Sequence, residues 1–445
     1  MTQQKTKHYR PKNRKFEYIM NSKFKKFEAY NIIHEKLPKL CPRLVPSPLW
    51  GLSLAKLARM EPRIASIISD DSSALVEEIS RYWMSLDRSG TCEVCGAKGS
   101  EIDEDWLYFV FDNEEKPVQV TTIKLKDVVG GALKNFMGVA HLRSLRLLCP
   151  DCHLAKHQGY ALTHGREREA LEWLQKINGL NSLDEVKELV DQAFNIYYRL
   201  KRIRKWDIHV GRLKGLDKET RKNIQKLLNH MYGSGFSLDG GWLYYSSPAE
   251  HKAIRLAEQE GNAILNEAKK KAGEGHYKDE VWVRCLEEIV KDKLEAEGIY
   301  VSEEGLTLLV RLLLDRFKNA GLFEELFVWE SVGKWIAMVP NPLYEKIFRK
   351  TLKSLEKSGL AYRAKILCEK GEIDDARLPI IVYAPTSFAP GYISSVAKVL
   401  KIVLNRFGLM GEIYFKPDVF TYMGIYSEKG RRASIYSTIP YREGV

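Results

Sequence analysis

The stretches CEVC (92–95) and CPDC (149–152) decide the fold of the first half of this chain. Each is a C-x2-C pair, and 53 residues separate the two pairs. A two-residue spacing lets both thiolates of one turn reach the same tetrahedral Zn²⁺, and four thiolates leave no open position on the metal. Two such pairs favour a zinc site over four unrelated buried thiols. We therefore predict a structural zinc ion held by Cys92, Cys95, Cys149 and Cys152.

Two histidines directly follow the second pair. In HLAKH (153–157), His153 and His157 stand four residues apart and share one face of a helix. Such a pair can hold a divalent metal with open positions, as a phosphodiester-cleaving centre requires. The acidic stretch EIDEDWLYFVFD (101–112) adds Asp103 and Asp105 as candidate catalytic carboxylates for Mg²⁺ or another divalent ion. The alternative is that both histidines cap the helix or pack beside the zinc.

The residues around the cysteine pairs predict a small α+β module. WLYFVF (106–111) and VQVTTIKL (118–125) are rich in β-formers and predict two strands between the pairs. Apolar residues at helical spacing predict helices within 52–86, 166–177 and 184–204. The expected module is a ββα zinc element with flanking helices.

The string LRLLCPDCHLAKHQG (145–159) resembles the HNH endonuclease family in its zinc-knuckle form. PLWGLSL (48–54), GYALTHGREREALEWLQKINGL (159–180) and AFNIYYRLKRIRKWDIHV (193–210) resemble the flanks of bacterial members, so the resemblance covers about 45–210. It implies a β-hairpin between the two cysteine pairs and a helix after the second. It also implies a metal site that clamps a scissile phosphate.

The chain departs from the HNH pattern at the general base. The family carries that histidine on the first strand of the hairpin, but the stretch 101–112 contains none. Ser144 stands where many members have the asparagine that orients the histidine. His141, which we expect in the loop before the second pair, is the candidate substitute. Two functions stay open: a metal-dependent endonuclease, and a zinc-stabilised ββα element that binds nucleic acid without cutting it.

Positive charge is concentrated in two blocks. The chain has a net charge of +12, and residues 1–45 hold twelve Lys and Arg against three acids. Residues 199–226 hold eleven against three. Local excess of this kind suits a polyanion, because neutralised phosphates release counterions. We expect a nucleic acid partner, RNA or DNA, against the alternative of a solvated helix face or tail.

The C-terminal strings GKW (333–335), KPDVFTYMGIY (416–426) and RRASIYST (431–438) mix cations with aromatic residues. That mixture suits a phosphate and a stacked base, whereas the alternative for the aromatic residues is packing within the core. The candidate phosphate- or nucleotide-binding residues are Lys334, Trp335, Lys416, Asp418, Tyr422, Arg431 and Arg432.

These strings resemble the family typified by the basophilic-leukaemia-expressed protein, over about 329–440. The resemblance implies a fold like that of translation initiation factor 4E. Some members are labelled phosphothreonine lyases, a reaction that needs a basic lysine, for which Lys416 is the candidate, and a cationic phosphate clamp. A third function is therefore a phosphoprotein- or nucleotide-ligand module in which zinc is purely structural.

The length of 445 residues predicts several domains, and 44% hydrophobic residues exclude a disordered chain. The interpretation is an α+β multidomain protein: a basic arm (1–45), the HNH-like zinc module (46–210), a helical region (211–328) and a 4E-like α/β domain (329–445). In the last domain, 335–339, 380–384, 412–416 and 433–437 are expected as strands. The stretches 342–358 and 392–407 are expected as helices.

Cysteine usage and hydropathy predict a cytoplasmic protein. Seven cysteines are too few for a disulfide scaffold, which indicates a reducing compartment. No apolar run approaches the roughly 20 residues of a membrane span, and the N-terminus lacks the apolar segment of a secretory signal. We therefore expect no membrane partner.

Overall fold

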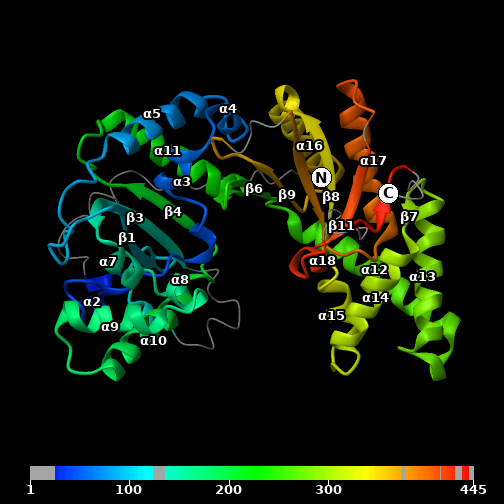
Figure 1. Ribbon diagram of the computed structural model, residues 1–445, viewed down its shortest axis with the longest axis horizontal. Coiled ribbons are helices and arrows are strands. Elements are labelled where there is room, and N and C mark those ends of the chain that lie inside the picture. Colours follow the sequence, from blue (N-terminus) through cyan, green and yellow to red (C-terminus); the bar gives the residue numbers. More distant parts are fainter. Residues whose placement is uncertain (1–25, 124–135, 372–375, 411, 426–432, 440–445) are drawn as a thin grey trace. The chain divides into compact units, whose positions relative to one another are not determined.

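The computed structural model describes residues 26–123, 136–371, 376–410, 412–425 and 433–439. They form a mixed α+β structure of two compact units (Figure 1). The first unit comprises the described residues of Met1–Ala58 and Ala74–Tyr232, and the second those of Arg59–Ser73 and Gly233–Val445. The units divide the chain differently from the sequence-based domain boundaries.

A four-stranded sheet in the order β2-β1-β3-β4 forms the centre of the first unit. The strands are β1 (Glu101–Phe111), β2 (Pro117–Val118), β3 (Met137–Leu148) and β4 (Trp206–Val210). β1 and β3 pair antiparallel over their whole length, and β4 lies parallel to β3. A strand at 106–111 was predicted and lies within β1. Of the strand predicted at 118–125, only Val118 lies in a strand, β2, because Val120–Thr122 form a 3-10 turn, and residues 124–125 lie outside the described residues.

His141 is also placed differently from the sequence-based expectation. It lies within β3, opposite Leu107 of β1, and not in a loop before the second cysteine pair. The stretch MGVAHLRSLRLL is long enough to pair with the apolar part of β1, so cross-strand packing makes it the second strand of the hairpin. The antiparallel strands β1 and β3 therefore lie between the two cysteine pairs.

Helices cover this sheet on two sides in the view of Figure 1. On one side lie α7 (Pro150–Lys156), α9 (Glu167–Asn178) and α10 (Leu183–Leu200), and on the other lie α5 (Ser72–Ser85) and α11 (Lys218–Ser234). α9 ends at Asn178, and Gly179 after it, at a φ of +70°, provides the left-handed turn, while the Ser182 side chain caps α10. The predicted helix at 166–177 corresponds to α9. The predicted helix at 184–204 corresponds to α10, which ends at Leu200, four residues earlier than predicted. The helices are α2 (Asn31–Lys36), α3 (Leu54–Arg59), α5 (Ser72–Ser85), α7 (Pro150–Lys156), α8 (Gln158–Thr163), α9 (Glu167–Asn178), α10 (Leu183–Leu200) and α11 (Lys218–Ser234).

Residues 26–45 belong to the first unit and do not form a separate arm. Glu28 forms a β-bridge with Phe109 of β1. Arg43 is buried, and its Nη1 donates to Oε1 of Glu28 at 3.0 Å and to the carbonyl oxygen of Trp106 at 2.7 Å. The burial of this ion pair against β1 fixes the segment to the sheet. The rest of the predicted basic arm, residues 1–25, lies outside the described residues.

An eight-stranded sheet in the order β5-β6-β9-β10-β8-β11-β12-β7 forms the centre of the second unit. Its strands are β5 (Phe236–Asp239), β6 (Trp242–Ser246), β7 (Tyr300–Val301), β8 (Gly333–Pro340), β9 (Arg363–Leu367), β10 (Arg377–Ala384), β11 (Ile413–Pro417) and β12 (Tyr436–Ser437). The described helices are α4 (Pro62–Ala65), α12 (Glu250–Ala272), α13 (Glu280–Glu295), α14 (Glu303–Phe317), α15 (Phe323–Trp329), α16 (Tyr344–Ser358), α17 (Pro390–Arg406) and α18 (Asp418–Tyr422).

The predicted helical region 211–328 does not form a domain of its own. α11 belongs to the first unit, while the hairpin β5–β6 extends the C-terminal sheet through β6 and β9, which pair from Trp242 opposite Leu367 to Ser246 opposite Arg363. The Gly-rich stretch 233–241 provides the turn of this hairpin, with Gly240 and Gly241 at positive φ. This pairing satisfies the backbone N–H and C=O groups at the edge of β9. It joins segments that are far apart in the chain, so no local sequence pattern predicts it.

Candidate functional site

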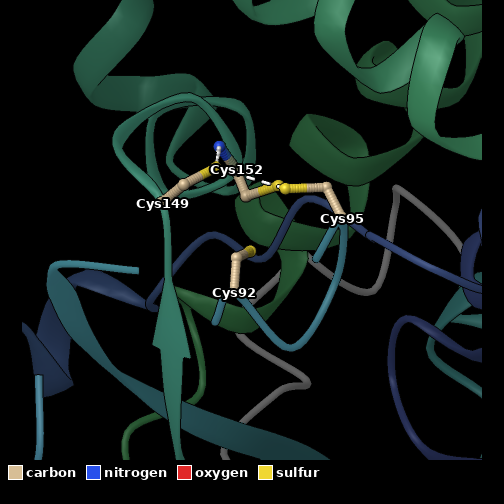
Figure 2. Close-up of side chains that lie close together, drawn as sticks. All are labelled: Cys92, Cys95, Cys149 and Cys152. Atoms are coloured by element: carbon tan, nitrogen blue, oxygen red, sulfur yellow. Dashed lines mark hydrogen bonds between the residues drawn. The ribbon is translucent and has the colours of Figure 1, made fainter. Parts of the chain in front are cut away.

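The four predicted zinc ligands come together in the first unit. The Sγ atoms of Cys92, Cys95, Cys149 and Cys152 lie within 4.8 Å of one another, and Figure 2 shows the four side chains converging. The Sγ atoms of Cys95 and Cys149 are 3.5 Å apart. A tetrahedral zinc ion with Zn–S bonds of about 2.3 Å separates its sulfurs by about 3.8 Å. The four thiols therefore fit a zinc ion.

Local backbone structure positions both cysteine pairs. In the first pair, Gly96 at φ +75° closes a turn in which its N–H donates to the carbonyl of Cys92 at 2.9 Å. The N–H of Glu93 donates to the carbonyl of Leu147 at 2.9 Å, which joins this turn to β3. In the second pair, Cys149 caps α7, and its Sγ accepts from the N–H of Cys152 at 3.4 Å. The two pairs thus meet where the hairpin ends and the helix begins.

Apolar side chains surround these thiols, and few hydrogen-bond donors contact them. Cys92, Cys149 and Cys152 are buried in a cluster that includes residues of α9 and α10. Burial raises the pKa of Cys152, although the indole Nε1 of Trp173 donates to its Sγ at 3.2 Å. Burial also opposes ionisation of Cys92, but hydrogen bonds from backbone N–H groups outweigh it and lower its pKa to about 7. A set of four thiols, three of them buried and Cys95 partly exposed, suits a structural metal.

A second group of metal-ligating side chains lies on the same ββα element. Asp103 of β1 and His153 and His157 of α7 and its C-terminus have ligand atoms within 4.8 Å of one another. His157 Nε2 lies 3.2 Å from Oδ1 of Asp103, and the two imidazole rings are 4.6 Å apart. Asp103 is buried and both histidines are partly exposed. The group can offer one oxygen and two nitrogens to a divalent ion that keeps open positions.

Lys156 is the charged neighbour of this group. Its buried ammonium forms an ion pair with Oδ2 of Asp103 and donates to the carbonyl of Glu104 at 3.1 Å. Burial opposes ionisation of Asp103, but Lys156 and His157 outweigh it and lower the pKa of this carboxyl. Asp103 is therefore a carboxylate that turns one oxygen to Lys156 and the other to the histidines. No residue pattern in the sequence pointed to Lys156.

Asp105, the other candidate carboxylate, is not part of the group. It accepts from Nε of Arg143 at 2.7 Å, and Arg143 and the buried Arg43 lower its pKa against the effect of burial. His141, the candidate substitute base, is also outside the group. It is buried and pairs with His209 of β4, with the two Nδ1 atoms 2.7 Å apart. The parallel pairing of β3 and β4 creates this contact, which sequence analysis missed.

In the second unit, the candidate phosphate- or nucleotide-binding residues differ in their contacts and in their exposure. Nζ of Lys334 lies 2.7 Å from Oδ1 of Asp418, and Nζ of Lys416 donates to the carbonyl of Ile425 at 2.8 Å. Tyr422, in the helix that Asp418 begins, is 85% exposed. Trp335 is a correction: it is fully buried, and its indole donates to the carbonyl of Ile393, so its ring packs in the core and cannot stack on a ligand. Arg431 and Arg432 lie outside the described residues.

The basic block 199–226 is divided between structural and exposed cations. Nη1 of Arg199 donates to the carbonyls of Val120, Thr121 and Ile123 at 2.8 to 3.0 Å, so this cation holds a turn. Most of the others are exposed around β4 and α11: Arg202, Arg204, Lys205, Arg212, Lys214, Lys218, Lys222 and Lys226. The described part of the chain contains no helix long and apolar enough to cross a membrane.

Comparisons with protein-family models, with curated proteins and with solved structures find no match to this chain.

Proposed function

We propose that this chain is a zinc-containing nucleic-acid-binding protein with an HNH-like ββα module. The observation that carries the proposal is the group of four thiols at the base of the β1–β3 hairpin. The same unit exposes eight cations between residues 202 and 226. The zinc would lock the hairpin to α7. The exposed cations would follow the phosphate backbone.

The test is the salt dependence of binding. Fluorescence anisotropy with labelled RNA and DNA should show affinity falling by orders of magnitude between about 50 and 200 mM salt. Replacing Arg212, Lys214, Lys218 and Lys222 by Gln should reduce the log–log salt slope by up to about 3. The control replaces two exposed lysines of α16, Lys353→Gln with Lys357→Gln, and should leave both the affinity and the salt slope unchanged. Salt-insensitive binding, or no binding to either nucleic acid, would refute the proposal.

A second candidate, a metal-dependent endonuclease, is favoured by one specific observation: Asp103, His153 and His157 converge beside the zinc ligands. A divalent ion bound there would supply Lewis acidity toward a phosphodiester and an activated water. The protein's own part would be to hold that ion through these three side chains. Lys156 would keep Asp103 ionised and oriented, because its ammonium contacts the oxygen that faces away from His157.

Cleavage assays separate this candidate from binding alone. Plasmid DNA and structured RNA are incubated with Mg²⁺, Mn²⁺ or Ni²⁺ and with the wild type, His153→Ala or His157→Ala. His164→Ala, an exposed histidine on the same unit, is the control. An endonuclease should lose at least about 100-fold in rate in either site variant and keep its rate in the control. Metal-dependent cutting that survives both site substitutions would exclude this assignment.

For the second unit we propose a 4E-like domain that recognises a phosphorylated group or nucleotide. The observation that favours it is the placement of Lys334, Lys416 and Asp418 on neighbouring elements at one end of β8 and β11. If the first unit binds no nucleic acid, this ligand module with purely structural zinc is the remaining candidate.

A further inference from the structure

Two tyrosines and a lysine gather at the C-terminal end of α10, which is marked in Figure 1. Tyr197 and Tyr198 lie in the last turn of the helix, and their ring centroids are 5.4 Å apart. The ammonium of Lys201, directly after the helix, lies 4.6 Å from the ring centroid of Tyr198 and 5.8 Å from that of Tyr197. Both distances are within the range of cation–π attraction, so one cation holds the two rings together.

Trp50 is joined to these tyrosines through the segment that precedes it. Burial raises the pKa of Tyr197, and a hydrogen bond with the side chain of Ser47 opposes this rise. The 3-10 turn that begins at Ser47 leads into Trp50, whose backbone N–H donates to the carbonyl of Ser47 at 3.3 Å. The indole Nε1 of Trp50 donates to the carbonyl of Val45 at 2.6 Å, which fixes the orientation of the ring.

The rings of this group are large and exposed. Trp50 is 57% exposed and Tyr198 is 50% exposed, while Tyr197 and Lys201 are partly exposed. Exposed apolar residues scattered singly over a surface are normal, whereas aromatic rings connected by contacts indicate a binding surface. We call Trp50, Tyr197, Tyr198 and Lys201 the aromatic patch.

Positive charge adjoins the aromatic patch. The stretch RLKRIRK (199–205) contains five cations and no acid, and Arg202, Arg204 and Lys205 are exposed. The core of a protein–protein interface is depleted of charged residues, so this charge favours a polyanion over a protein partner. Aromatic rings beside cations bind single-stranded nucleic acids, because the rings stack on bases and the cations follow the phosphates. Within a duplex the neighbouring pairs cover the faces of each base, so exposed rings stack on unpaired bases.

We propose that the aromatic patch stacks the unpaired bases of a single-stranded nucleic acid. The proposal deepens the nucleic acid binding proposed for the first unit and rests on it. Trp50 and Tyr198 provide the exposed ring faces, and Tyr197 and Lys201 hold Tyr198 in place. The cations of 202–205 contact the phosphates of the same strand.

The test is fluorescence anisotropy of the full chain with labelled strands at about 50 mM salt. The probes are oligothymidylate and oligouridylate, an abasic strand of the same length, and a duplex. The abasic strand keeps the phosphates and lacks the bases, so it measures the electrostatic part of binding alone. Oligothymidylate or oligouridylate should bind at least about fivefold more tightly than the abasic strand.

Substitutions in the aromatic patch locate the stacking. Tyr198→Ala and Trp50→Ala should each weaken binding of the base-carrying strand about 5- to 100-fold and leave binding of the abasic strand and the duplex unchanged. Tyr198→Phe keeps the ring and should keep the wild-type affinity. Tyr300→Ala and Trp329→Ala, which remove exposed rings of the second unit, are the matched controls. Thermal unfolding of each variant verifies that the fold is intact.

Two results would overturn the proposal: equal affinity for the base-carrying and abasic strands, or affinity that survives both Tyr198→Ala and Trp50→Ala. If binding in either case still weakens with salt, the nucleic acid function of the first unit stands and base stacking alone fails. If no probe binds at all, both proposals fail.

Discussion

His157 Nε2 lies 3.2 Å from Oδ1 of Asp103, so the end of the helix that follows the second cysteine pair contacts the first strand of the hairpin. We predict that this contact marks a second, weaker metal site. Mn²⁺ titration followed by electron paramagnetic resonance should detect it in the zinc-loaded protein. His157→Ala should weaken Mn²⁺ binding about 10- to 100-fold and leave the zinc content unchanged. His164→Ala should match the wild type.

The four-thiol group predicts one zinc per chain. Cys152→Ala should abolish zinc in the purified protein, because a site of three thiolates binds the metal far less tightly and Cys152 is fully buried in the shell. The unfolding midpoint should fall by about 10 °C or more. Cys285→Ala, at a buried thiol outside the group, should retain the zinc. Elemental analysis beside thermal unfolding measures both, and zinc retained in Cys152→Ala would contradict the assignment.

The buried ion pair between Arg43 and Glu28 predicts that residues 26–45 stabilise the first unit. Arg43→Met should cost about 3–5 kcal/mol, since it leaves Glu28 buried without its partner. The double variant Arg43→Met with Glu28→Gln should recover part of that loss. Lys39→Met, at an exposed position, is the control. Urea unfolding measures all four proteins, and a cost below about 1 kcal/mol for Arg43→Met would contradict the packing described.

The His141–His209 pair predicts acid sensitivity. Burial, with the charges of His209 and Arg143, lowers the pKa of His141 to about 4. Because the unfolded state takes up a proton near pH 6.5 and the folded state only near pH 4, the free energy of unfolding should fall as pH drops through this window, by up to about 3 kcal/mol. His141→Gln should flatten this slope relative to the wild type, while His164→Gln should keep it. Urea unfolding between pH 7 and pH 4.5 gives the slopes.

Truncation of two aromatic residues of the C-terminal strings should have very different effects on stability. Trp335→Ala should destabilise the protein by about 3–5 kcal/mol, because it empties a fully buried site between the sheet and α17. Tyr422→Ala should change stability by no more than about 0.5 kcal/mol, because the ring is exposed. Chemical denaturation checks both, and a stable Trp335→Ala variant would show that this ring is not a core residue.

Several elements could be predicted because their signals are local. The spacing within each cysteine pair is a property of one turn, and His153 and His157 share a face because a helix repeats every 3.6 residues. The alternation of strands and helices after residue 333 matches β8, α16, β10, α17 and β11. β9 was missed, because RAKIL is short and contains two cations, so that it lacks the apolar run of a strand although Gly359 ends the helix before it.

The sequence by itself determined the two cysteine pairs and the pair of histidines, since each pair depends on residues within one turn or helix. Only the tertiary structure decided which of the acids at 101–105 meets His157, because that choice depends on where α7 lies against β1. The pairing of His141 with His209 and that of Lys334 with Asp418 likewise join residues from different elements. Strand order arises from long-range packing and backbone hydrogen bonding, and no local spacing encodes it.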